Sequence, residues 1–194
     1  MFSGITEIKI PINKISQNKG NLLVEIKKPL KWNLKIGESV LVDGICSTVI
    51  KDGRSFQVEY MPETLSKTNI KERKVGDQVN LERSLKLNDV LSGHLVTGHI
   101  DTTGFVKRIT KAGNSKVIEF IFKGNFSKYL VSKGSVAING VSLTIVKAFK
   151  NNFTVSLIPH TLKVTNIGEL KKGDKVNLEF DIIAKYLERL VNPV

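Results

Sequence analysis

The sequence has little of what marks several large protein classes. Its 194 residues include one cysteine, Cys46, so no disulfide can form within the chain, and no Cys/His spacing typical of zinc sites occurs. No apolar run reaches the roughly 18 residues that a membrane-spanning helix needs. The first residues contain neither a basic segment nor a long apolar one, so we expect no signal peptide. Together these absences predict a soluble, reduced, cytoplasmic protein without a metal site.

Charge of one sign is in excess, but it is not concentrated. Thirty Lys and Arg against 18 Asp and Glu give a net charge of +12 at pH 7, which raises a nucleic-acid-binding barrel as one hypothesis. The lysines are spread along the whole chain, and aromatic residues, at 7%, are too few to form stacking platforms for single strands. We therefore interpret the excess as a solvated surface and expect neither a nucleic-acid nor a membrane partner.

The sequence contains an internal repeat, in which the second half resembles the first. The matching segments are 62–70 with 159–167 and 74–82 with 171–179, both at a spacing of 97, and 40–49 with 136–145 at a spacing of 96. Two copies of nearly a hundred residues predict a duplicated domain rather than a solenoid. We expect one domain over residues 1–93 and a second over 94–194, joined at a small-residue link near Ser92 and Gly93.

Each copy is predicted to consist of β-strands. Residues 22–26 and 55–60 in the first half, and 117–122 and 153–158 in the second, nearly alternate apolar and polar residues as half-buried strands do. Turn residues such as Gly, Asp and Asn separate these runs. Many short strands at this spacing predict a small closed barrel or Greek key in each half, because closure removes exposed sheet edges.

The C-terminal segment breaks the β pattern. After Asp181, a candidate N-cap, apolar residues recur at helical spacing over about 182–191, which predicts one helix with a single apolar face. A helix this short is stable only when it is docked on something. The sequence leaves two alternatives open, packing on its own barrel and contact with another subunit.

The segments kept in both halves are rich in small and hydroxylic residues, whereas packing alone would keep large apolar ones. We therefore expect a small-molecule pocket at each barrel mouth, and two similar pockets imply two similar ligands. The hydroxyls in 46–48 and 142–144 are the better candidates for ligand hydrogen bonds. The Thr-Asn pairs at 68–69 and 165–166 are more typical of turns.

Two histidines, His94 and His99, form the other unusual feature. They are five residues apart, which does not place them on one helical face and puts them on opposite faces of a strand, so a metal pair is not expected. One of the two can point into a pocket while the other packs in the structure. A proton-transfer role is open to the histidine that faces the pocket.

The start MFSGIT, the segments VDGICSTV and NGVSLT, the junction GHLVTGHID and the tail DIIAKYLERL together resemble the riboflavin synthase alpha chain family over essentially the whole chain. The resemblance implies an all-β fold of two tandem six-stranded Greek-key barrels with a C-terminal α-helix. It also implies a homotrimer, in which the N-terminal barrel of one subunit meets the C-terminal barrel of its neighbour.

The activity that the resemblance implies is the last step of riboflavin biosynthesis. Two molecules of 6,7-dimethyl-8-ribityllumazine, stacked face to face, exchange a four-carbon unit and give riboflavin and 5-amino-6-ribitylamino-2,4(1H,3H)-pyrimidinedione, with no cofactor and no metal. The alternative is a non-catalytic lumazine- or flavin-binding protein, because such relatives share the duplicated fold.

The resemblance also implies the site residues. The first pocket is expected to contain Gly4, Ile5, Thr6, Cys46, Ser47, Thr48, Glu59, Tyr60, Met61, Pro62, Glu63 and Thr64. The second is expected to contain Gly98, His99, Ile100, Ser142, Leu143, Thr144, Leu157, Ile158, Pro159, His160, Thr161 and Leu162, with Lys133 reaching a neighbour's ligand. Phe2 either shapes a pocket or packs in the core.

Four of these residues are expected to take part in catalysis. His99 is the candidate for the proton relay, Ser142 or Cys46 for assisting addition to the ring, and Asp181 for orienting a partner.

Two positions depart from the family pattern. Asn139 stands where many relatives have Asp, and an amide cannot act as a carboxylate base. His160 stands where Glu is usual, and a histidine can titrate near neutral pH and alter ligand affinity.

Overall fold

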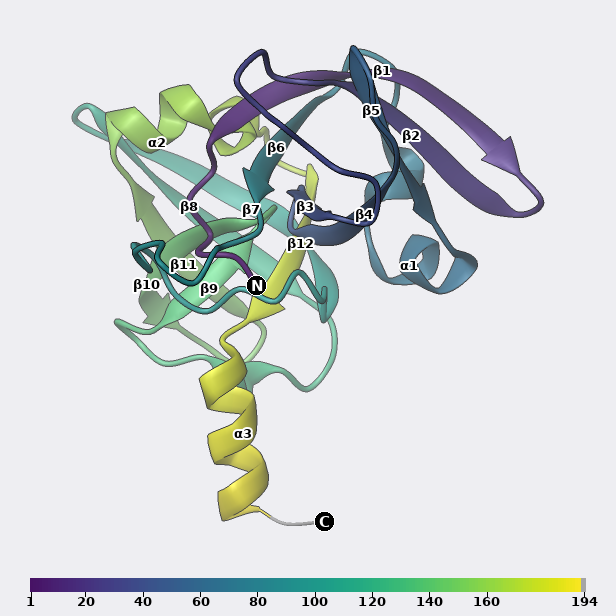
Figure 1. Ribbon diagram of the computed structural model, residues 1–194. Coiled ribbons are helices and arrows are strands. Elements are labelled where there is room, and N and C mark those ends of the chain that lie inside the picture. The colour runs from purple at the N-terminus through teal and green to yellow at the C-terminus, as the bar shows by residue number, and fades with distance from the viewer. Residues whose placement is uncertain (193–194) are drawn as a thin grey trace.

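The computed structural model describes residues 1–192 and shows two closed β-barrels followed by a helix (Figure 1). The first barrel contains β1 (Ile8–Asn18), β2 (Asn21–Lys27), β3 (Ser39–Val42), β4 (Ile45–Lys51), β5 (Ser55–Tyr60) and β6 (Gln78–Arg83). The second contains β7 (Thr102–Ala112), β8 (Ser115–Phe122), β9 (Ser135–Ile138), β10 (Val141–Ala148), β11 (Asn152–Leu157) and β12 (Lys175–Phe180). The helices are α1 (Pro62–Lys67), α2 (Pro159–Val164) and α3 (Ile182–Val191), with short 3₁₀ helices η1 (Ile70–Glu72), η2 (Ser127–Tyr129) and η3 (Asn166–Glu169).

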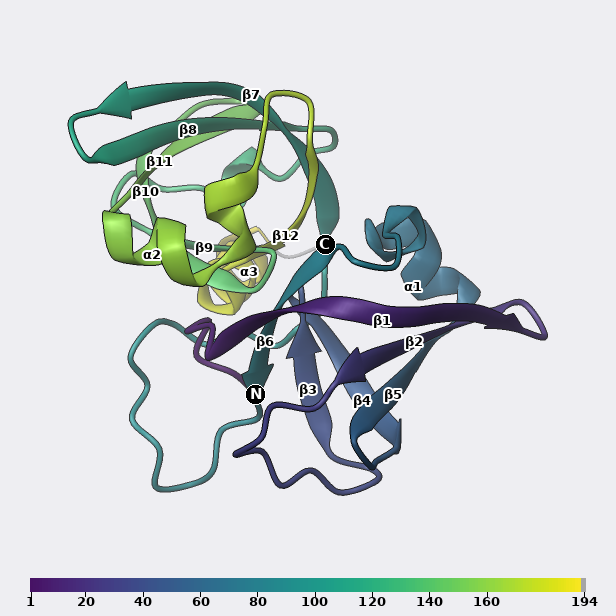
Figure 2. The ribbon, with the colours of Figure 1, turned by 90° about the horizontal axis from the view of Figure 1, so that it is seen from above.

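The two barrels have the same topology and lie side by side as separate closed sheets (Figure 2). Around the first barrel the strand order is β1-β2-β5-β4-β3-β6, and the second repeats it as β7-β8-β11-β10-β9-β12. All neighbouring strands pair in antiparallel fashion, and β6 closes the first barrel by pairing with β1. The predicted pair of six-stranded barrels is therefore confirmed.

Apolar side chains fill the interior of each barrel. In the first, Val24, Phe56 and Val58 are fully buried, because alternate residues of a strand point to the same side of the sheet. In the second, the rings of Phe120 and Phe153 stack with centroids 5.6 Å apart. Interiors packed in this way leave no room for a ring the size of lumazine. The candidate sites described below lie on the outer faces of the barrels.

The hairpins β3–β4 and β9–β10 meet tip to tip between the barrels. Asp43 and Gly44 have φ values of 46° and 82°, and Asn139 and Gly140 have 44° and 79°, as a two-residue type I′ turn requires. A Cβ added to Gly44 would lie 2.7 Å from the nitrogen of Gly140, and one added to Gly140 would lie 2.8 Å from the nitrogen of Gly44. Glycine is needed at both positions because the two main chains touch there.

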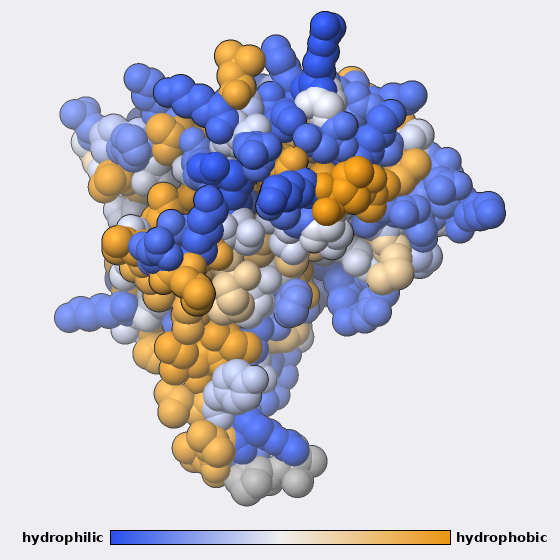
Figure 3. Space-filling view, viewed as in Figure 1, coloured by the Kyte–Doolittle hydropathy of each residue, from blue (hydrophilic) through white to orange (hydrophobic). Residues whose placement is uncertain are grey.

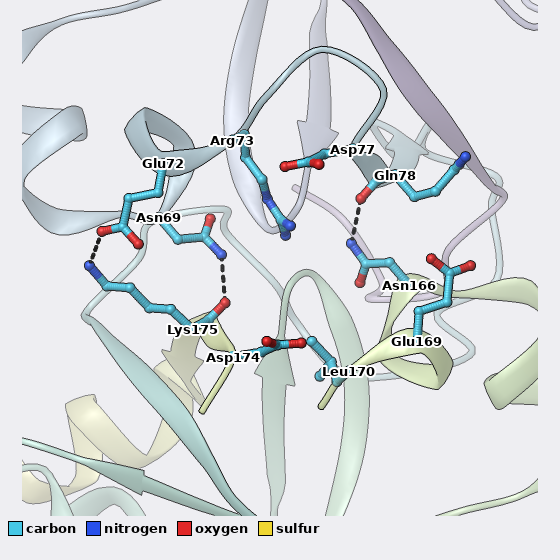
Figure 4. A pocket seen from close by; sticks show the side chains of 10 residues that line it. All are labelled: Asn69, Glu72, Arg73, Asp77, Gln78, Asn166, Glu169, Leu170, Asp174 and Lys175. Carbon is cyan, nitrogen blue, oxygen red and sulfur yellow. Dashed lines mark hydrogen bonds and ion pairs between the residues drawn. The ribbon is translucent and has the colours of Figure 1, made fainter. Parts of the chain in front are cut away.

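Buried amides connect the barrels around this contact. Asn80 Nδ2 donates to the carbonyl of Asn139 at 3.0 Å and to Oδ1 of Asn166 at 2.9 Å. In the other half, the main-chain N–H of Asn69 donates to Oδ1 of Asn177 at 2.8 Å. Asn69 and Asn166 also line a polar cleft of about 310 Å³ (Figure 4). The turn residues predicted at 69 and 166 thus also bind the opposite barrel, a contact that turn chemistry alone does not reveal.

One charged pair breaks the symmetry of this network. Asp43 is fully buried and forms an ion pair with Arg73, with 2.6 Å between Oδ2 and Nη2. Burial raises the pKa of the Asp43 carboxyl, and the Arg73 guanidinium opposes that rise. The counterparts in the second half are Asn139 and Leu170, which carry no charge. The amide at 139 therefore keeps a buried hydrogen-bonding role, accepting from the N–H of Asn177 at 2.8 Å, where no arginine is present to balance a carboxylate.

Helix α3 extends away from both barrels (Figure 1). As predicted, Asp181 caps it, because its Oδ1 accepts from the N–H of Ile183 at 2.9 Å. An ion pair between Lys128 and Glu188 ties the helix to η2. Its apolar side chains are exposed along one side (Figure 3), and they are Ile183, Tyr186, Leu187, Leu190 and Val191. Over residues 1–192 no helix has the length and apolar character needed to cross a membrane.

Removal of Arg73 alone is expected to destabilise the protein more than removal of the whole ion pair. Arg73→Leu leaves a buried carboxylate without its counter-charge, which costs about 3 kcal/mol. The double variant Asp43→Asn/Arg73→Leu copies the neutral arrangement of the second barrel and is expected to recover most of that loss. Urea unfolding at pH 7 measures the free energy of all three proteins. A double variant no more stable than Arg73→Leu would contradict this account.

Candidate functional site

The segments that open the two halves, residues 2–6 and 96–100, each lie against the barrel of the other half. They are called the opening segments below. The N–H of Ser142, at the start of β10, donates to the carbonyl of Gly4 at 2.7 Å, and the N–H of Cys46, at the start of β4, donates to the carbonyl of Gly98 at 2.9 Å. A Cβ on Gly4 would lie 2.6 Å from Cβ of Ser142, and one on Gly98 would lie 2.6 Å from Cβ of Cys46. Both glycines also have positive φ, at 75° and 80°. Only glycine fits at these two contacts.

These contacts between each opening segment and the opposite barrel correct one expectation from the sequence. Residues 4–6 were expected to share a pocket with 46–48, and residues 98–100 with 142–144, but the structure pairs them the other way round. The reason is that the two opening segments bind each other through an antiparallel bridge between Phe2 and Val96. Each segment therefore passes between the barrels and reaches the hairpin of the opposite one. Phe2 is fully buried in this contact, so it packs between the barrels as the second of its two expected roles requires.

A small cavity marks the first candidate site, on the outer face of the first barrel. Its volume is about 180 Å³, and its lining residues are Ile45, Glu63, Thr64, Lys67, Thr68, Gly98, His99 and Ile100. The start of β4, helix α1 and the opening segment of the second half thus each contribute to it. Ile45, Lys67 and Thr68 were not predicted, because nothing in the sequence shows which face of α1 meets the crossed segment.

Four of the expected contact residues point their side chains into the barrel interiors. The Ser47 and Tyr60 hydroxyl oxygens lie 2.8 Å apart inside the first barrel, and burial raises the pKa of Tyr60. Leu143 and Leu157 are the buried counterparts in the second barrel. These four residues can meet a surface ligand only through main-chain atoms, because strand neighbours alternate between the two faces of the sheet.

Apart from Phe2, Gly4 and Gly98, which are buried, the other expected residues lie on the surface or at its edge. The exposed ones are Ile5, Thr48, Met61, Pro62, Glu63, His99, Lys133, Thr144, Ile158, Pro159 and His160. The half-buried ones are Thr6, Cys46, Glu59, Thr64, Ile100, Ser142, Thr161, Leu162 and Asp181. Within the described part of the chain, no group of three or more His, Cys, Asp or Glu side chains is placed to hold a metal ion.

A histidine–serine pair marks the second candidate site, at the start of β10. Nδ1 of His94 lies 2.7 Å from Oγ of Ser142, and the N–H of His94 donates to the carbonyl of Ser3 at 3.1 Å. The ring is buried, and its Nε2 has no hydrogen-bond partner among residues 1–192. Burial lowers the pKa of His94, while the nearby Asp181 carboxylate opposes that change. A neutral imidazole in this position can accept a proton from the serine hydroxyl.

The sequence analysis took His99 as the candidate proton relay, whereas the structure pairs His94 with the hydroxyl of Ser142. His94 lies outside the segments that match between the two copies. Comparison of the two copies therefore gave no signal for the pair with Ser142. His99, five residues later, is carried to the first barrel by the crossed segment instead.

Lys133 has an unfavourable backbone conformation. Its φ is 70°, whereas the equivalent position in the first half is Gly37, with φ 91°. The two N–H groups make the same bond, to the carbonyls of Ile145 and Val49, at 2.8 Å in both cases. Glycine adopts this conformation without a Cβ clash, so a lysine there is strained. The side chain is nevertheless exposed, which points to a role for the lysine other than packing.

Comparison with known proteins identifies relatives over nearly the full length. Residues 3–84 and 97–181 each match the lumazine binding domain. The chain is 39% identical over 196 residues to riboflavin synthase of Actinobacillus pleuropneumoniae, covering 98% of this chain and 90% of that protein. It is 37% identical over 194 residues to riboflavin synthase of Bacillus subtilis, covering 99% and 90%.

Solved structures give the same result for the fold. The crystal structure of LumP complexed with riboflavin is similar with a TM-score of 0.84 at 28% identity, covering 93% of this chain and 99% of that one. The crystal structure of LumP complexed with 6,7-dimethyl-8-(1'-D-ribityl) lumazine is similar with a TM-score of 0.82 at 27% identity, covering 92% and 98%.

We expect His94 to titrate below the ordinary histidine pKa of about 6.5. Asp181→Asn is expected to lower the His94 pKa further, because it removes the one nearby charge that raises it. The asparagine should still cap α3, since Asn and Asp are equally good N-caps. An NMR pH titration of the His94 ring protons in both proteins measures the two values. An unchanged or higher pKa in the variant would show that Asp181 does not act on His94.

Proposed function

The chain belongs to the riboflavin synthase family. From this membership and the geometry of the two candidate sites, we infer that it acts on 6,7-dimethyl-8-ribityllumazine. Two molecules of this substrate are converted into riboflavin and 5-amino-6-ribitylamino-2,4(1H,3H)-pyrimidinedione. The observation that carries the catalytic assignment is the 2.7 Å contact between His94 and Ser142. A protein that only bound lumazine would not need a buried base hydrogen-bonded to a half-buried hydroxyl.

The chemistry requires little more than a base and a second ring. A methyl group on the electron-poor lumazine ring is acidic enough for a modest base to remove its proton. The resulting anion attacks the partner ring, and a four-carbon unit passes from one molecule to the other, so no external oxidant is needed. Holding the two rings together contributes up to about 7–11 kcal/mol of the barrier reduction.

We assign the proton transfer to one histidine at each of the two candidate sites. At the second site, neutral His94 can draw a proton through Ser142. At the first site, His99 lines the cavity beside the start of β4, where Cys46 lies, and it is the candidate proton relay there. Ser142 or Cys46 assists addition to the ring, and the Asp181 carboxylate partly opposes the lowering of the His94 pKa by burial. The substrate-contact residues are those expected from the sequence, regrouped by the crossed segments.

The active assembly proposed is a homotrimer, in which the first barrel of one subunit faces the second barrel of its neighbour. Three observations support it. The first-site cavity of about 180 Å³ is smaller than the roughly 300–1,000 Å³ of most ligand pockets, so a second surface is needed to enclose the ligand. The apolar side of α3 is uncovered in the single chain (Figure 3). Lys133 is exposed at a strained position, which leaves its side chain free to contact a neighbouring subunit.

Two further assignments belong to this proposal. The domains divide at residue 93, which lies between the two matches to the lumazine binding domain. The protein acts in the cytoplasm, because a chain with one cysteine forms no internal disulfide and suits a reducing compartment.

Purified protein given 6,7-dimethyl-8-ribityllumazine alone is expected to produce riboflavin and the pyrimidinedione in equal amounts. The reaction exchanges a unit between two identical molecules, so half of the consumed substrate should appear as riboflavin. Absorbance and green fluorescence follow riboflavin, and chromatography measures both products. Tight binding without turnover would select the alternative of a lumazine-binding protein.

Lys133→Gly is expected to separate activity from stability. Relief of backbone strain should leave the free energy of unfolding unchanged or raise it by up to about 1 kcal/mol. Loss of the cationic side chain should lower kcat/KM about tenfold, the cost of one hydrogen bond to a charged group. Urea unfolding and steady-state kinetics measure the two effects, with Lys172→Gly as an exposed control outside both faces. Equal activity of the two variants would remove Lys133 from the site.

A further inference from the structure

Two buried glutamates hold the opening segments by the same set of hydrogen bonds. Oε1 of Glu82, on β6, accepts from the N–H of Ser3 at 2.6 Å and from its hydroxyl at 2.8 Å, and Oε2 accepts from the N–H of Gly4 at 3.0 Å. Glu179, on β12, accepts in the same way from the N–H of Thr97 at 2.7 Å, from its hydroxyl at 2.6 Å and from the N–H of Gly98 at 2.9 Å. The arrangement occurs once in each half of the molecule.

These carboxylates are placed where a charge is costly. Glu82 and Glu179 are only 4% and 1% exposed, and neither forms an ion pair among the described residues. Burial raises the pKa of both carboxyls, and the hydrogen bonds from the segments oppose that rise. A buried carboxylate is tolerated when several donors satisfy it. Those donors come chiefly from the two opening segments, so the carboxylates and the segments depend on each other.

Each held segment forms part of the site on the opposite barrel. Glu179 belongs to the second barrel, but Gly98, which it holds, bonds to Cys46 of the first and precedes His99 in the first-site cavity. Glu82 belongs to the first barrel, but Gly4, which it holds, bonds to Ser142 of the second. Neither carboxylate lines the 180 Å³ cavity or takes part in the His94–Ser142 contact.

We propose that Glu82 and Glu179 are positioning residues, each of which fixes the geometry of the substrate site on the barrel to which it does not belong. The effect on turnover rests on the proposed function. The effect on geometry does not, because it can be measured without substrate.

Cys46 provides the probe, since it is the single cysteine of the chain and the Gly98 backbone lies against it. In Glu179→Gln, an amide NH₂ replaces one acceptor oxygen and faces a main-chain N–H, so the segment loses part of its hold. The reaction of Cys46 with 5,5'-dithiobis(2-nitrobenzoic acid) is expected to become about tenfold faster, the loss of one charge-assisted hydrogen bond. Glu82→Gln makes the same chemical change in the other half and should leave the Cys46 rate at the wild-type value.

A second pair of variants, each lacking a single hydroxyl, tests the same contact with less risk of unfolding the protein. Thr97→Ala removes only the hydroxyl bond to Glu179, and Ser3→Ala removes the equivalent bond to Glu82. Thr97→Ala is expected to raise the Cys46 rate several-fold above that of Ser3→Ala, with circular dichroism and melting temperatures showing that both proteins are folded. Glu179→Asp, which keeps the charge, should restore part of the protection that Glu179→Gln loses.

Kinetics then test the consequence for the site. Glu179→Gln is expected to lower kcat about tenfold with a smaller change in KM, because His99 is displaced while most contact residues stay in place. Equal Cys46 rates in the Glu179 and Glu82 variants, or in the Thr97 and Ser3 variants, would overturn the proposal. If the thiol rates differ as expected but wild-type protein does not convert the lumazine, the positioning role stands and the proposed function fails.

Discussion

The crossed main-chain contact between the two halves is the constraint on which the rest of the structure depends. The N–H groups of Cys46 and Ser142 each bond to a carbonyl of the other half's opening segment. Buried main-chain groups must be paired, so neither barrel can rotate away without losing these bonds. The same contact explains why glycine occupies positions 4 and 98, and it makes each candidate site a product of both halves of the chain. A duplicated domain that folded as two independent units would have no such sites.

Within this frame the two copies have diverged in chemistry while keeping one backbone. The buried ion pair Asp43–Arg73 is replaced by uncharged residues at the equivalent positions of the second half, and Lys133 is the equivalent of Gly37 in the first half. His94, which lies 2.7 Å from the Ser142 hydroxyl, falls outside the segments that match between the two copies. The reaction of this family gives two identical molecules different parts to play, donor and acceptor of the four-carbon unit. Sites that share a shape but differ in their charged and basic groups provide the asymmetry that such a reaction needs.

The local elements were predictable because their signals are local. Alternation of apolar and polar residues predicted the strands, and the spacing of 97 residues predicted two like barrels. Asp181 was predicted as the helix cap because capping depends on one side chain and the next turn. The resemblance to a known family added the strand number and the reaction. Neither source predicted that Glu82 and Glu179, which the repeat comparison had aligned, bind the opening segments.

By itself the sequence determined what each stretch of chain becomes, because hydrophobic period, turn residues and internal similarity all act over a few residues or between aligned copies. Only the tertiary structure decided which stretches meet. It placed residues 98–100 on the first barrel and residue 4 on the second, turned Ser47 and Tyr60 inward, and joined His94 to Ser142. The crossed placement of residues 4 and 98–100 depends on the antiparallel bridge between Phe2 and Val96, 94 residues apart, and no local pattern in the sequence specifies a contact over that distance.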